Sequence, residues 1–383
     1  MKIAIDLTAI PSELTGVGFY VKNLIMALSE LNQKDRFLVF VSQKNHASFY
    51  FDRDNFEFVN VPDMPAVLRL IWEQIVLPVE LMRQKIDLLH SPHYSTPILG
   101  ESYKRVVTFC DMTFLLFPQY HQQYKTFYFK KMIRAALKKA DRIISISNST
   151  TRDIIRCFPQ VDKQKISTIH LSAANIFQPY DDRAEIERQT RAYALPDKYL
   201  LYVGTLEPRK NIFGLLQAYN ALEKALREAY KLVIVGKKGW HYEEIFKYVE
   251  ANGLKDQVIF TGYIAEDILP YVYNGASLFI YPSFYEGFGI PVLEALKCGL
   301  PVITSNISSM PEIAGKAAIL IDPKKPEEIA IAIGQVLNNS QYVSVMRQHS
   351  LAQAQKFSWR KCAAETVAVY KEALASQTNK GGK

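Results

Sequence analysis

Two glutamates in one glycine-containing stretch are the residues of this sequence whose types and spacing best suit chemistry. The stretch reads Tyr281-Pro-Ser-Phe-Tyr-Glu286-Gly287-Phe288-Gly289-Ile290-Pro291-Val-Leu-Glu294 and joins a strand-like run to a helical pattern ending at Gly299. The glycines allow a ligand to approach the backbone, and the helix start offers free N–H groups to an anion. Glu286 then lies in the turn, with Glu294 about two helical turns later. An ordinary strand–turn–helix connection with two solvated acids fits the spacing equally well.

A basic pair follows an earlier strand-like run, in Gly204-Thr205-Leu-Glu-Pro-Arg209-Lys210. A guanidinium offers a planar fork and an ammonium a point charge, so the pair suits a diphosphate. Taken alone, such a pair is more often simply solvated. Two further strand ends carry Gly236 and Tyr263-Ile264, which either line a ligand or form ordinary turns.

These residues need strands and helices to position them, and the chain alternates the two types of pattern. The predicted strands are 2–6, 36–42, 56–60, 86–90, 105–110, 142–147, 165–170, 199–204, 231–236, 258–262, 277–281, 301–305 and 317–321. Helical patterns lie between several of them, including 19–31 and 126–140. Such alternation predicts an α/β fold with parallel sheets.

The rhythm restarts after a polar, strand-poor stretch near residues 178–197, which predicts two doubly wound sheets. We expect an N-terminal Rossmann-like domain over 1–176 and a C-terminal one over 177–357. A last helix, 358–377, is expected to cross back to the first domain. Ligands of such sheets bind at the carboxyl ends of strands, so the natural site is the cleft between the two sheets.

The segment from Glu286 to Glu294 resembles the E-x7-E signature of retaining GT-B glycosyltransferases of family 4. The resemblance continues through Gly299-Leu-Pro-Val-Ile-Thr-Ser-Asn, Met310-Pro-Glu-Ile-Ala-Gly315 and Ala318-Ile-Leu-Ile-Asp-Pro323, in the family's order and spacing. It covers most of residues 195–355 and, more weakly, the N-terminal half. The resemblance therefore implies the GT-B fold, in which two Rossmann-like domains face each other across a cleft. The domain over 1–176 would lie on the acceptor side, and the domain over 177–357 would bind the nucleotide-sugar.

The resemblance also implies roles for individual residues. Glu294 would hold the ribose hydroxyls of a nucleotide, while Glu286 and the backbone of Gly287, Phe288, Gly289 and Ile290 would hold the donor sugar and diphosphate. Arg209 and Lys210 would stabilise the leaving diphosphate. Loops containing Gly204, Thr205, Gly236, Tyr263 and Ile264 would line the nucleotide pocket. No Asp-x-Asp motif stands in a suitable loop, and enzymes of this type use the cations instead, so neither a metal nor another cofactor is expected.

The N-terminal half adds two segments. Thr15-Gly16-Val17-Gly18 resembles the family's T-G-[IV]-G loop, which faces the donor phosphates; Val21 stands where a dinucleotide-binding G-x-G-x-x-G would need glycine. Val106-Val-Thr-Phe-Cys110-Asp111 resembles a stretch that usually reads V-V-T-[IV]-H-D, whose histidine lies near the donor sugar. Cys110 replaces that histidine, and a thiol is a weak donor. His90 and His93 end a neighbouring strand; they either reach the same space or are structural, with Cys110 a small buried residue.

A basic amphipathic pattern spans residues 124–142. Apolar residues recur at helical spacing, and six lysines and arginines between residues 130 and 142 cover the rest. Either the apolar face is core and the cations are solvated, or the helix lies against anionic lipid headgroups. Related enzymes often glycosylate membrane-borne lipids, which favours a peripheral membrane contact.

Composition excludes some classes of protein. The 383 residues carry a formal charge of +8, 49% are hydrophobic, and extensive disorder is therefore excluded. The charge admits nucleic acid, an anionic membrane or a phosphorylated substrate, but neither RNP-like aromatic strands nor a dense basic stripe indicates nucleic acid. No signal-peptide or membrane-spanning stretch is found, and the four cysteines lack metal-ligand spacing. We expect a cytoplasmic protein, peripheral on the inner face of the cell membrane if the basic helix binds lipid.

The predicted function is hexosyl transfer, with retention, from a nucleotide-diphospho-sugar to a hydroxyl of a glycan or lipid-linked acceptor. In detail the sequence looks most like bacterial enzymes that build O-antigen or exopolysaccharide from GDP-mannose, which favours mannosyl transfer. Glucosyl or rhamnosyl transfer from a UDP- or dTDP-sugar needs little change in these motifs. A GT-B nucleotide-sugar epimerase and a non-catalytic anion-binding protein are the alternatives from other classes.

Overall fold

The computed structural model describes residues 1–11, 16–31, 34–120 and 123–376, which form two compact units. Unit 1 comprises residues 1–171 and 358–383, and unit 2 comprises 172–357. The observed division falls five residues before the expected boundary at 176/177, and the chain returns to unit 1 at Ser358. Each unit is described by itself.

Unit 1 contains a seven-stranded parallel sheet in the order β3-β2-β1-β4-β5-β6-β7. Its strands are β1 (Lys2–Asp6), β2 (Arg36–Ser42), β3 (Phe56–Val61), β4 (Leu88–Ser91), β5 (Lys104–Phe109), β6 (Arg142–Ser145) and β7 (Ile166–Thr168). Its helices are α1 (Gly16–Leu31), α2 (His46–Phe49), α3 (Ala66–Ile71), the π-helical η2 (Trp72–Val76), α4 (Leu77–Arg83), α5 (Thr113–Leu116), α6 (Gln123–Lys139), α7 (Asn148–Cys157) and α17 (Trp359–Ala375).

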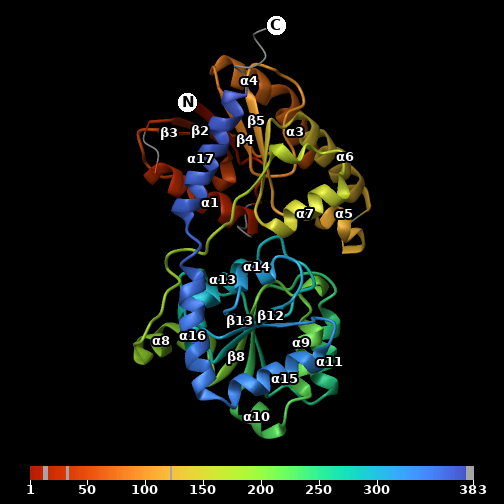
Figure 1. Cartoon of the computed structure of the whole chain (residues 1–383), viewed down its shortest axis with the longest axis vertical. Coiled ribbons are helices and arrows are strands. Elements are labelled where there is room, and N and C mark those ends of the chain that lie inside the picture. The colour runs from red at the N-terminus through yellow and green to blue at the C-terminus, as the bar shows by residue number, and fades with distance from the viewer. Residues whose placement is uncertain (12–15, 32–33, 121–122, 377–383) are drawn as a thin grey trace. The chain divides into compact units, whose positions relative to one another are not determined.

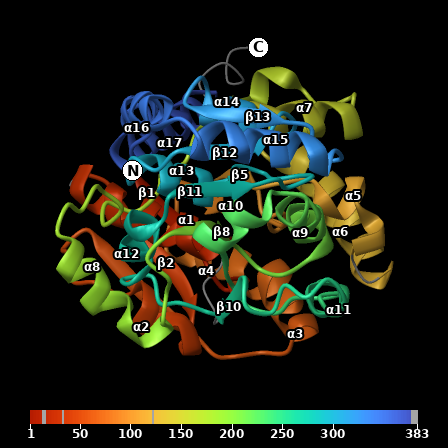
Figure 2. The same cartoon turned by 90° about the horizontal axis from the view of Figure 1, so that it is seen from below.

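Unit 2 contains a six-stranded parallel sheet in the order β10-β9-β8-β11-β12-β13, which Figure 2 shows from β10 through β8 and β11 to β13. Its strands are β8 (Tyr199–Val203), β9 (Lys231–Val235), β10 (Val258–Gly262), β11 (Leu278–Tyr281), β12 (Val302–Ser305) and β13 (Ala318–Ile321). Its helices are α8 (Arg183–Thr190), η6 (Pro208–Lys210, 3-10), α9 (Ile212–Asn220), α10 (Lys224–Ala229), α11 (Glu243–Ala251), α12 (Leu269–Gly275), α13 (Ile290–Lys297), α14 (Met310–Ala314), α15 (Pro326–Leu337) and α16 (Ser340–Ala354).

These elements confirm the predicted fold class of two doubly wound parallel sheets. All the predicted strands are present, with bounds that differ by at most two residues. The two central strands of unit 2, β8 and β11, are buried at every position, as parallel sheets covered on both faces require.

Strand β5 shows how alternation assigns side chains to the two faces of the first sheet. Val107 and Phe109 pack with Ile133 of α6 in one apolar cluster. Thr108 points to the opposite face, where its hydroxyl lies 3.2 Å from that of Tyr20 on α1 and 2.8 Å from His90 Nε2. Helix α17 covers this second face beside α1 (Figure 1). The period of two in a strand therefore separates an apolar layer from a layer with buried hydrogen bonds.

Each sheet has one pair of neighbouring strands from which the chain continues toward opposite edges of the sheet. This position is the switch point of the sheet. In unit 1 this switch point lies between β1 and β4, and in unit 2 between β8 and β11. Ligands of open α/β sheets bind beyond the carboxyl ends of the strands at such points. The residues that follow these four strands are therefore the candidates for binding.

Candidate functional site

The switch point of unit 2 brings together the basic pair and the first glutamate of the E-x7-E segment. Lys210 Nζ lies 2.5 Å from Glu286 Oε1, and Arg209 Nη1 lies 3.2 Å from Glu286 Oε2. Arg209 also forms an ion pair of 2.5 Å with Glu207 and donates to the carbonyl of Tyr285 at 2.6 Å. The charged residues that follow β8 and β11 thus form one connected cluster.

Local backbone geometry fixes the position of the basic pair. Asn211 lies between the short helix η6 and helix α9, capping the end of the first and the start of the second. Its backbone has a left-handed φ of 56°. The Asn211 amide donates to the carbonyls of Pro282 at 3.1 Å and Pro323 at 2.6 Å. Asparagine tolerates this conformation, and its side chain ties the loop after β8 to the loops after β11 and β13.

Hydroxyl groups that the sequence analysis did not assign hold Glu286 in place. Tyr281 and Ser283 donate to Oε1 at 2.9 and 2.8 Å. Ser308 and Ser309 donate to the main-chain carbonyl of Glu286 at 2.6 and 2.9 Å. Ser308 and Ser309 directly precede the Met310-Pro motif, and Tyr281 is the last residue of β11. Their position beside motifs already recognised in the sequence is the signal that could have identified them.

The charges of this cluster are set by burial and by pairing. Burial alone would raise the pKa of Glu286, but Lys210 and Arg209 outweigh it and lower the pKa to about 2. Burial lowers the pKa of Lys210, which Glu286 opposes. Glu286 is therefore a carboxylate at neutral pH, held between two cationic side chains.

The segment from Gly287 to Ile290 forms a tight turn into α13. Gly289 has a φ of 103°, which strains any residue that carries a Cβ, and a Cβ there would also displace the end of the Met310 side chain, 2.2 Å away. Phe288 is buried against Phe357, and its carbonyl accepts from Ser309 at 2.7 Å. Pro291 lies in the first turn of α13, where its missing N–H costs no hydrogen bond.

Glu294 lies on α13, and its environment differs from that of Glu286. Tyr273 donates to its Oε2 at 2.7 Å. Burial raises the pKa of Glu294 to about 7, and Glu266 adds to the increase, although the tyrosine and Lys297 oppose it. One carboxylate of the E-x7-E pair is thus ionised throughout the physiological range, and the other titrates within it.

The glycine-bearing strand ends of unit 2 lie against one another. A Cβ on Gly236 would lie 2.0 Å from the carbonyl oxygen of Gly204, so the loops after β8 and β9 touch. Thr205 follows in the first of these loops. After β10, Tyr263 is 60% exposed, with Lys237 Nζ 4.8 Å from its ring centre, whereas Ile264 is buried. An exposed aromatic ring beside a lysine is available to a ligand; Ile264 is core.

In unit 1, Gly16, Val17 and Gly18 begin α1, while Thr15 lies outside the described residues. Gly16 is exposed, and a Cβ there would have no neighbour within 4 Å. Because these residues belong to the other unit, their place in one site with Arg209 and Glu286 stays a prediction.

Cys110 and Asp111 follow β5. Cys110 is buried, and burial raises the pKa of its thiol, with the neighbouring Asp111 as a second cause, so the group is neutral. Asp111 accepts through one oxygen from Tyr94 at 2.8 Å, and from the Thr113 amide and hydroxyl at 2.9 and 2.7 Å. Asp111 is therefore anchored at the start of α5.

The histidine within β4, His90, differs from the one that follows the strand, His93. His90 is fully buried between the hydroxyls of Tyr370 and Thr108, at 2.7 and 2.8 Å, and burial lowers its pKa to about 3. This is the structural alternative for His90, which attaches α17 to the sheet. His93 lies beside Asp6 at the carboxyl edge.

Helix α6 decides in part between the two alternatives for residues 124–142, an apolar face packed in the core or a helix lying against lipid headgroups. Ile133, Ala136 and Leu137 are buried in the core of unit 1. Lys130, Lys131, Arg134, Lys138 and Lys139 are exposed. Among the side chains of this helix that the structure describes, Ile133, Ala136 and Leu137 therefore face the core, and the exposed cations are available to a membrane surface. In the part of the chain that the structure describes, no helix has both the length and the apolar character needed to span a membrane.

With this geometry in place, comparison with known proteins identifies the family. Residues 183–355 match the family described as "Glycosyl transferases group 1", and residues 14–172 match "Glycosyltransferase Family 4". The chain is 32% identical to O-antigen chain mannosyltransferase B of Escherichia coli over 97% of this chain and all of that one. It is 33% identical to the serotype-specific mannosyltransferase WbdA of Escherichia coli over 70% of this chain, which spans 34% of WbdA.

Solved structures agree on the fold. Sucrose-phosphate synthase from Thermosynechococcus elongatus superposes with a TM-score of 0.77 at 20% identity, covering 98% of this chain and 99% of that one. WaaG, a glycosyltransferase involved in lipopolysaccharide biosynthesis, superposes with a TM-score of 0.74 at 16% identity, covering 95% and 98%. The chain therefore belongs to the family 4 glycosyltransferases and is a hexosyltransferase with the GT-B fold.

Proposed function

We propose that the chain is a retaining mannosyltransferase that moves a mannosyl unit from GDP-mannose to a hydroxyl of a glycan or lipid-linked acceptor in cell-surface polysaccharide synthesis. The observation that carries this proposal is the 32% identity with an O-antigen chain mannosyltransferase over nearly the whole chain. The connected cluster of Arg209, Lys210 and Glu286 supplies the chemistry that such a transfer needs.

The proposed donor site lies at the switch point of unit 2. Arg209 and Lys210 bind the diphosphate and stabilise its charge as the glycosidic bond breaks. Glu286, the backbone of Gly287–Ile290 and the start of α13 bind the donor sugar and diphosphate, and Glu294 binds the ribose hydroxyls. Gly204, Thr205, Gly236 and Tyr263 line the nucleotide pocket, whereas the side chain of Ile264 is buried in the core.

The proposed mechanism keeps the α-configuration of the donor by front-face attack. A donor phosphate oxygen takes the acceptor proton, while the protein positions the reactants and stabilises charge. Gly16–Gly18, Cys110 and Asp111 are proposed to approach the same donor from unit 1. Since two cationic side chains serve the diphosphate, we propose that transfer needs no metal; activity that persists in excess EDTA supports this, and loss restored by Mg²⁺ or Mn²⁺ contradicts it.

Nucleotide identity is the first experiment. Calorimetric titration or thermal shift with GDP, UDP, ADP and dTDP, followed by their sugars, should show preference for GDP and GDP-mannose. Preference for UDP or dTDP supports the glucosyl or rhamnosyl alternative. Nucleotide release is then measured with and without acceptor: release with acceptor supports a transferase, whereas donor conversion without acceptor supports an epimerase, and binding without turnover a non-catalytic protein.

We also propose a cytoplasmic location with peripheral contact to anionic lipid on the inner face of the membrane, through the exposed cations of 124–142. Because the apolar side of α6 is core, this contact is electrostatic and should weaken with salt. Pelleting with phosphatidylglycerol-containing vesicles at low and high salt tests it, and a Lys130→Glu, Lys131→Glu variant should bind less. Absence of binding at low salt rejects the proposal.

A further inference from the structure

The helical segment 66–83 of unit 1 presents an exposed apolar surface. It consists of α3, η2 and α4, which follow one another without a break. Every exposed residue between Ala66 and Met82 is apolar. The large ones, with exposed fractions of 46–68%, form what we call the apolar stripe: Val67, Leu68, Ile71, Ile75, Val76, Val79 and Met82.

The opposite side of the same segment is already packed in the core of unit 1. Leu77 and Leu81 are buried in an apolar cluster with Phe40 of β2, and Trp72 packs against this cluster. A helix that is apolar on all sides is normally covered on all sides. Since one side of the segment is packed against the sheet, the apolar stripe is the side to which a partner can add.

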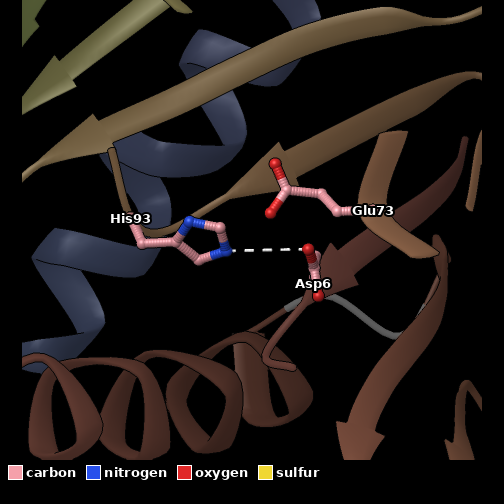
Figure 3. Close-up of side chains that lie close together, drawn as sticks. All are labelled: Asp6, Glu73 and His93. Carbon is pink, nitrogen blue, oxygen red and sulfur yellow. Dashed lines mark ion pairs between the residues drawn. The ribbon is translucent and has the colours of Figure 1, made fainter. Parts of the chain in front are cut away.

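Buried polar contacts prevent the segment from turning the apolar stripe inward. Glu73 lies on the core side, where it pairs with Arg69 at 2.7 Å and accepts from the Ser95 hydroxyl at 2.9 Å. One carboxylate oxygen of Glu73, one of Asp6 and a ring nitrogen of His93 lie within 4.8 Å of one another (Figure 3). Rotation of the segment would separate the buried carboxylate of Glu73 from its cation, which is costly. The stripe is therefore a fixed surface.

The size of the apolar stripe suits an interface between proteins. Its exposed fractions correspond to roughly 600–700 Å² of apolar surface, whereas the largest such patch on a typical monomer is about 300–600 Å². Gln74 holds the loop after β4 beside η2, by accepting from the Ile98 amide at 3.0 Å and donating to the Thr96 carbonyl at 3.2 Å. The exposed side chains of Ile98 and Leu99 in this loop bring the apolar surface to about 800 Å², the area that each partner of a standard interface buries.

The order of the side chains favours a second copy of the same segment as the partner. One line of the stripe advances in steps of three, four, four and three residues, which keeps its side chains on one side of a helix; it consists of Leu68, Ile71, Ile75, Val79 and Met82. This series is the same from either end, with Ile75 at its centre. In an antiparallel pair related by a two-fold axis, each residue therefore faces the one equally far beyond Ile75 in the second copy, Leu68 facing Met82 for example.

The charges at the two ends of the segment indicate the same arrangement. Asp63 is exposed just before the segment, and Arg83 and Lys85 are exposed at its other end. Antiparallel packing brings the acidic end of one copy to the basic end of the other, whereas parallel packing brings like charges together. A lipid surface fits less well, because the stripe contains no aromatic side chain and no exposed lysine or arginine lies between its first and last residues.

We propose that two copies of this chain associate through the apolar stripe, as a homodimer in which the two 66–83 segments pack antiparallel about a two-fold axis at Ile75. The interface uses residues of unit 1 and none of the charged cluster of unit 2. The inference therefore stands apart from the proposed function, and a failure of either leaves the other intact.

Analytical ultracentrifugation of the full chain at micromolar concentrations tests the association. The wild type should sediment as a dimer of about 87 kDa, twice the 43.7 kDa of one chain. Ile75→Glu places two carboxylates against each other at the axis, so the dissociation constant should rise at least about 100-fold. Ile331→Glu is the matched control and should stay dimeric, because Ile331 is an isoleucine of similar exposure, 61%, on α15 of unit 2. Circular dichroism should show that both variants are folded.

Disulfide cross-linking tests the orientation of the two copies. The variants are made in a Cys157→Ser background, because Cys157 is partly exposed and the other three cysteines are buried. Under mild oxidation Ile75→Cys should link to its own copy. Leu68→Cys and Met82→Cys should link to each other when the two proteins are mixed, and neither should link when alone.

Four results would overturn the inference. They are a wild type that is monomeric at every concentration, a dimer that Ile75→Glu leaves intact, self-linking of Leu68→Cys, which indicates parallel packing, and a lipid partner. The last is recognised by a monomeric wild type that pellets with phosphatidylcholine vesicles while Ile75→Glu does not. These vesicles are zwitterionic, so the electrostatic contact proposed for residues 124–142 does not contribute.

Discussion

At the switch point of unit 2 the charged side chains bind one another, whereas the switch point of unit 1 presents two buried polar atoms without a hydrogen-bond partner among the described residues. Arg209 and Lys210 both form ion pairs with Glu286. Asp6 Oδ2 and His93 Nε2 face each other at 3.6 Å. The same fold thus pairs the charges at one switch point and leaves two polar atoms without a hydrogen bond at the other.

This difference teaches what preorganisation requires in each unit. The cations of unit 2 are held by carboxylates before an anion arrives, so binding need not reorient them. In unit 1 the hydrogen bonds of Ser95 and Thr8 are made to Glu73 and to Asp6 Oδ1, and Asp6 Oδ2 and His93 Nε2 have no hydrogen-bond partner among the described residues.

The largest effect is expected from Glu286→Gln or Arg209→Gln. Each variant removes one charge of these ion pairs. The rate of transfer should fall at least about 100-fold, which is the effect of losing one preorganised group that stabilises charge in the transition state. Glu286→Gln leaves Lys210 buried without its carboxylate, so the free energy of unfolding should also fall by roughly 3 kcal/mol. Acceptor-dependent nucleotide release and chemical denaturation measure the two effects.

Glu250→Gln is the control for this pair of variants, because Glu250 forms only an exposed ion pair with Lys255. Its transfer rate should equal that of the wild type. Undiminished transfer by Glu286→Gln or Arg209→Gln contradicts the assignment of the donor site to unit 2.

The glycines of the two units should respond differently to alanine. Gly236→Ala places a Cβ 2.0 Å from the carbonyl oxygen of Gly204, so it should cost about 1–3 kcal/mol of stability and disturb the nucleotide loop. Gly16→Ala has open space and starts a helix, so stability should be unchanged or rise by up to about 1 kcal/mol.

Turnover of the donor by Gly16→Ala shows whether this loop has a role beyond stability. If a diphosphate approaches the start of α1, Gly16→Ala should remain folded and lose turnover. A stable Gly16→Ala with a normal KM for the sugar nucleotide would remove this loop from the donor site.

A smaller effect is expected from pH, and it separates the two glutamates of unit 2. Glu294, with a pKa of about 7, is protonated below that pH and ionised above it, whereas Glu286, with a pKa of about 2, stays ionised. Only the ionised form of Glu294 offers both oxygens as acceptors to ribose hydroxyls. GDP affinity should therefore rise between pH 6 and 8, by at most about tenfold per unit, and Glu294→Gln should abolish the rise. A wild-type affinity that is flat or falls over this range contradicts the ribose role.

The same titration acts on stability in the opposite direction. Because folding raises the pKa of Glu294 from 4.5 to about 7, its contribution to the free energy of unfolding is present below pH 4.5 and is lost as pH rises through 7. Without nucleotide, the wild type should therefore lose this contribution over the pH range in which it gains affinity.

How far the sequence predicts these sites depends on the range of the interactions. Strand ends carry local signals, so Arg209, Lys210, Glu286 and the glycine turns lie directly after strands that the sequence predicted. The prediction failed to find Asp6 and Glu73, because their burial and nearness to His93 depend on how β1, η2 and β4 come together in space. The same holds for the alternatives at His90, which were decided by Tyr370, distant in sequence but bonded to it on α17.

The smallest change in turnover is expected from Cys110→His, which tests whether unit 1 contributes to the donor site through the end of β5. The buried thiol is neutral and a weak donor, and the related motif has a histidine that lies near the donor sugar. The imidazole is larger than the space that a buried cysteine fills, so stability should fall by about 1–3 kcal/mol. Turnover at a temperature where the variant is folded should nevertheless be retained or raised, because the ring can donate a hydrogen bond that the thiol supplies poorly. Cys110→Ala, which removes the thiol and adds no donor, is the matched variant. If Cys110→His loses most of its turnover while Cys110→Ala keeps it, this position packs the core of unit 1 and has no part in binding the donor.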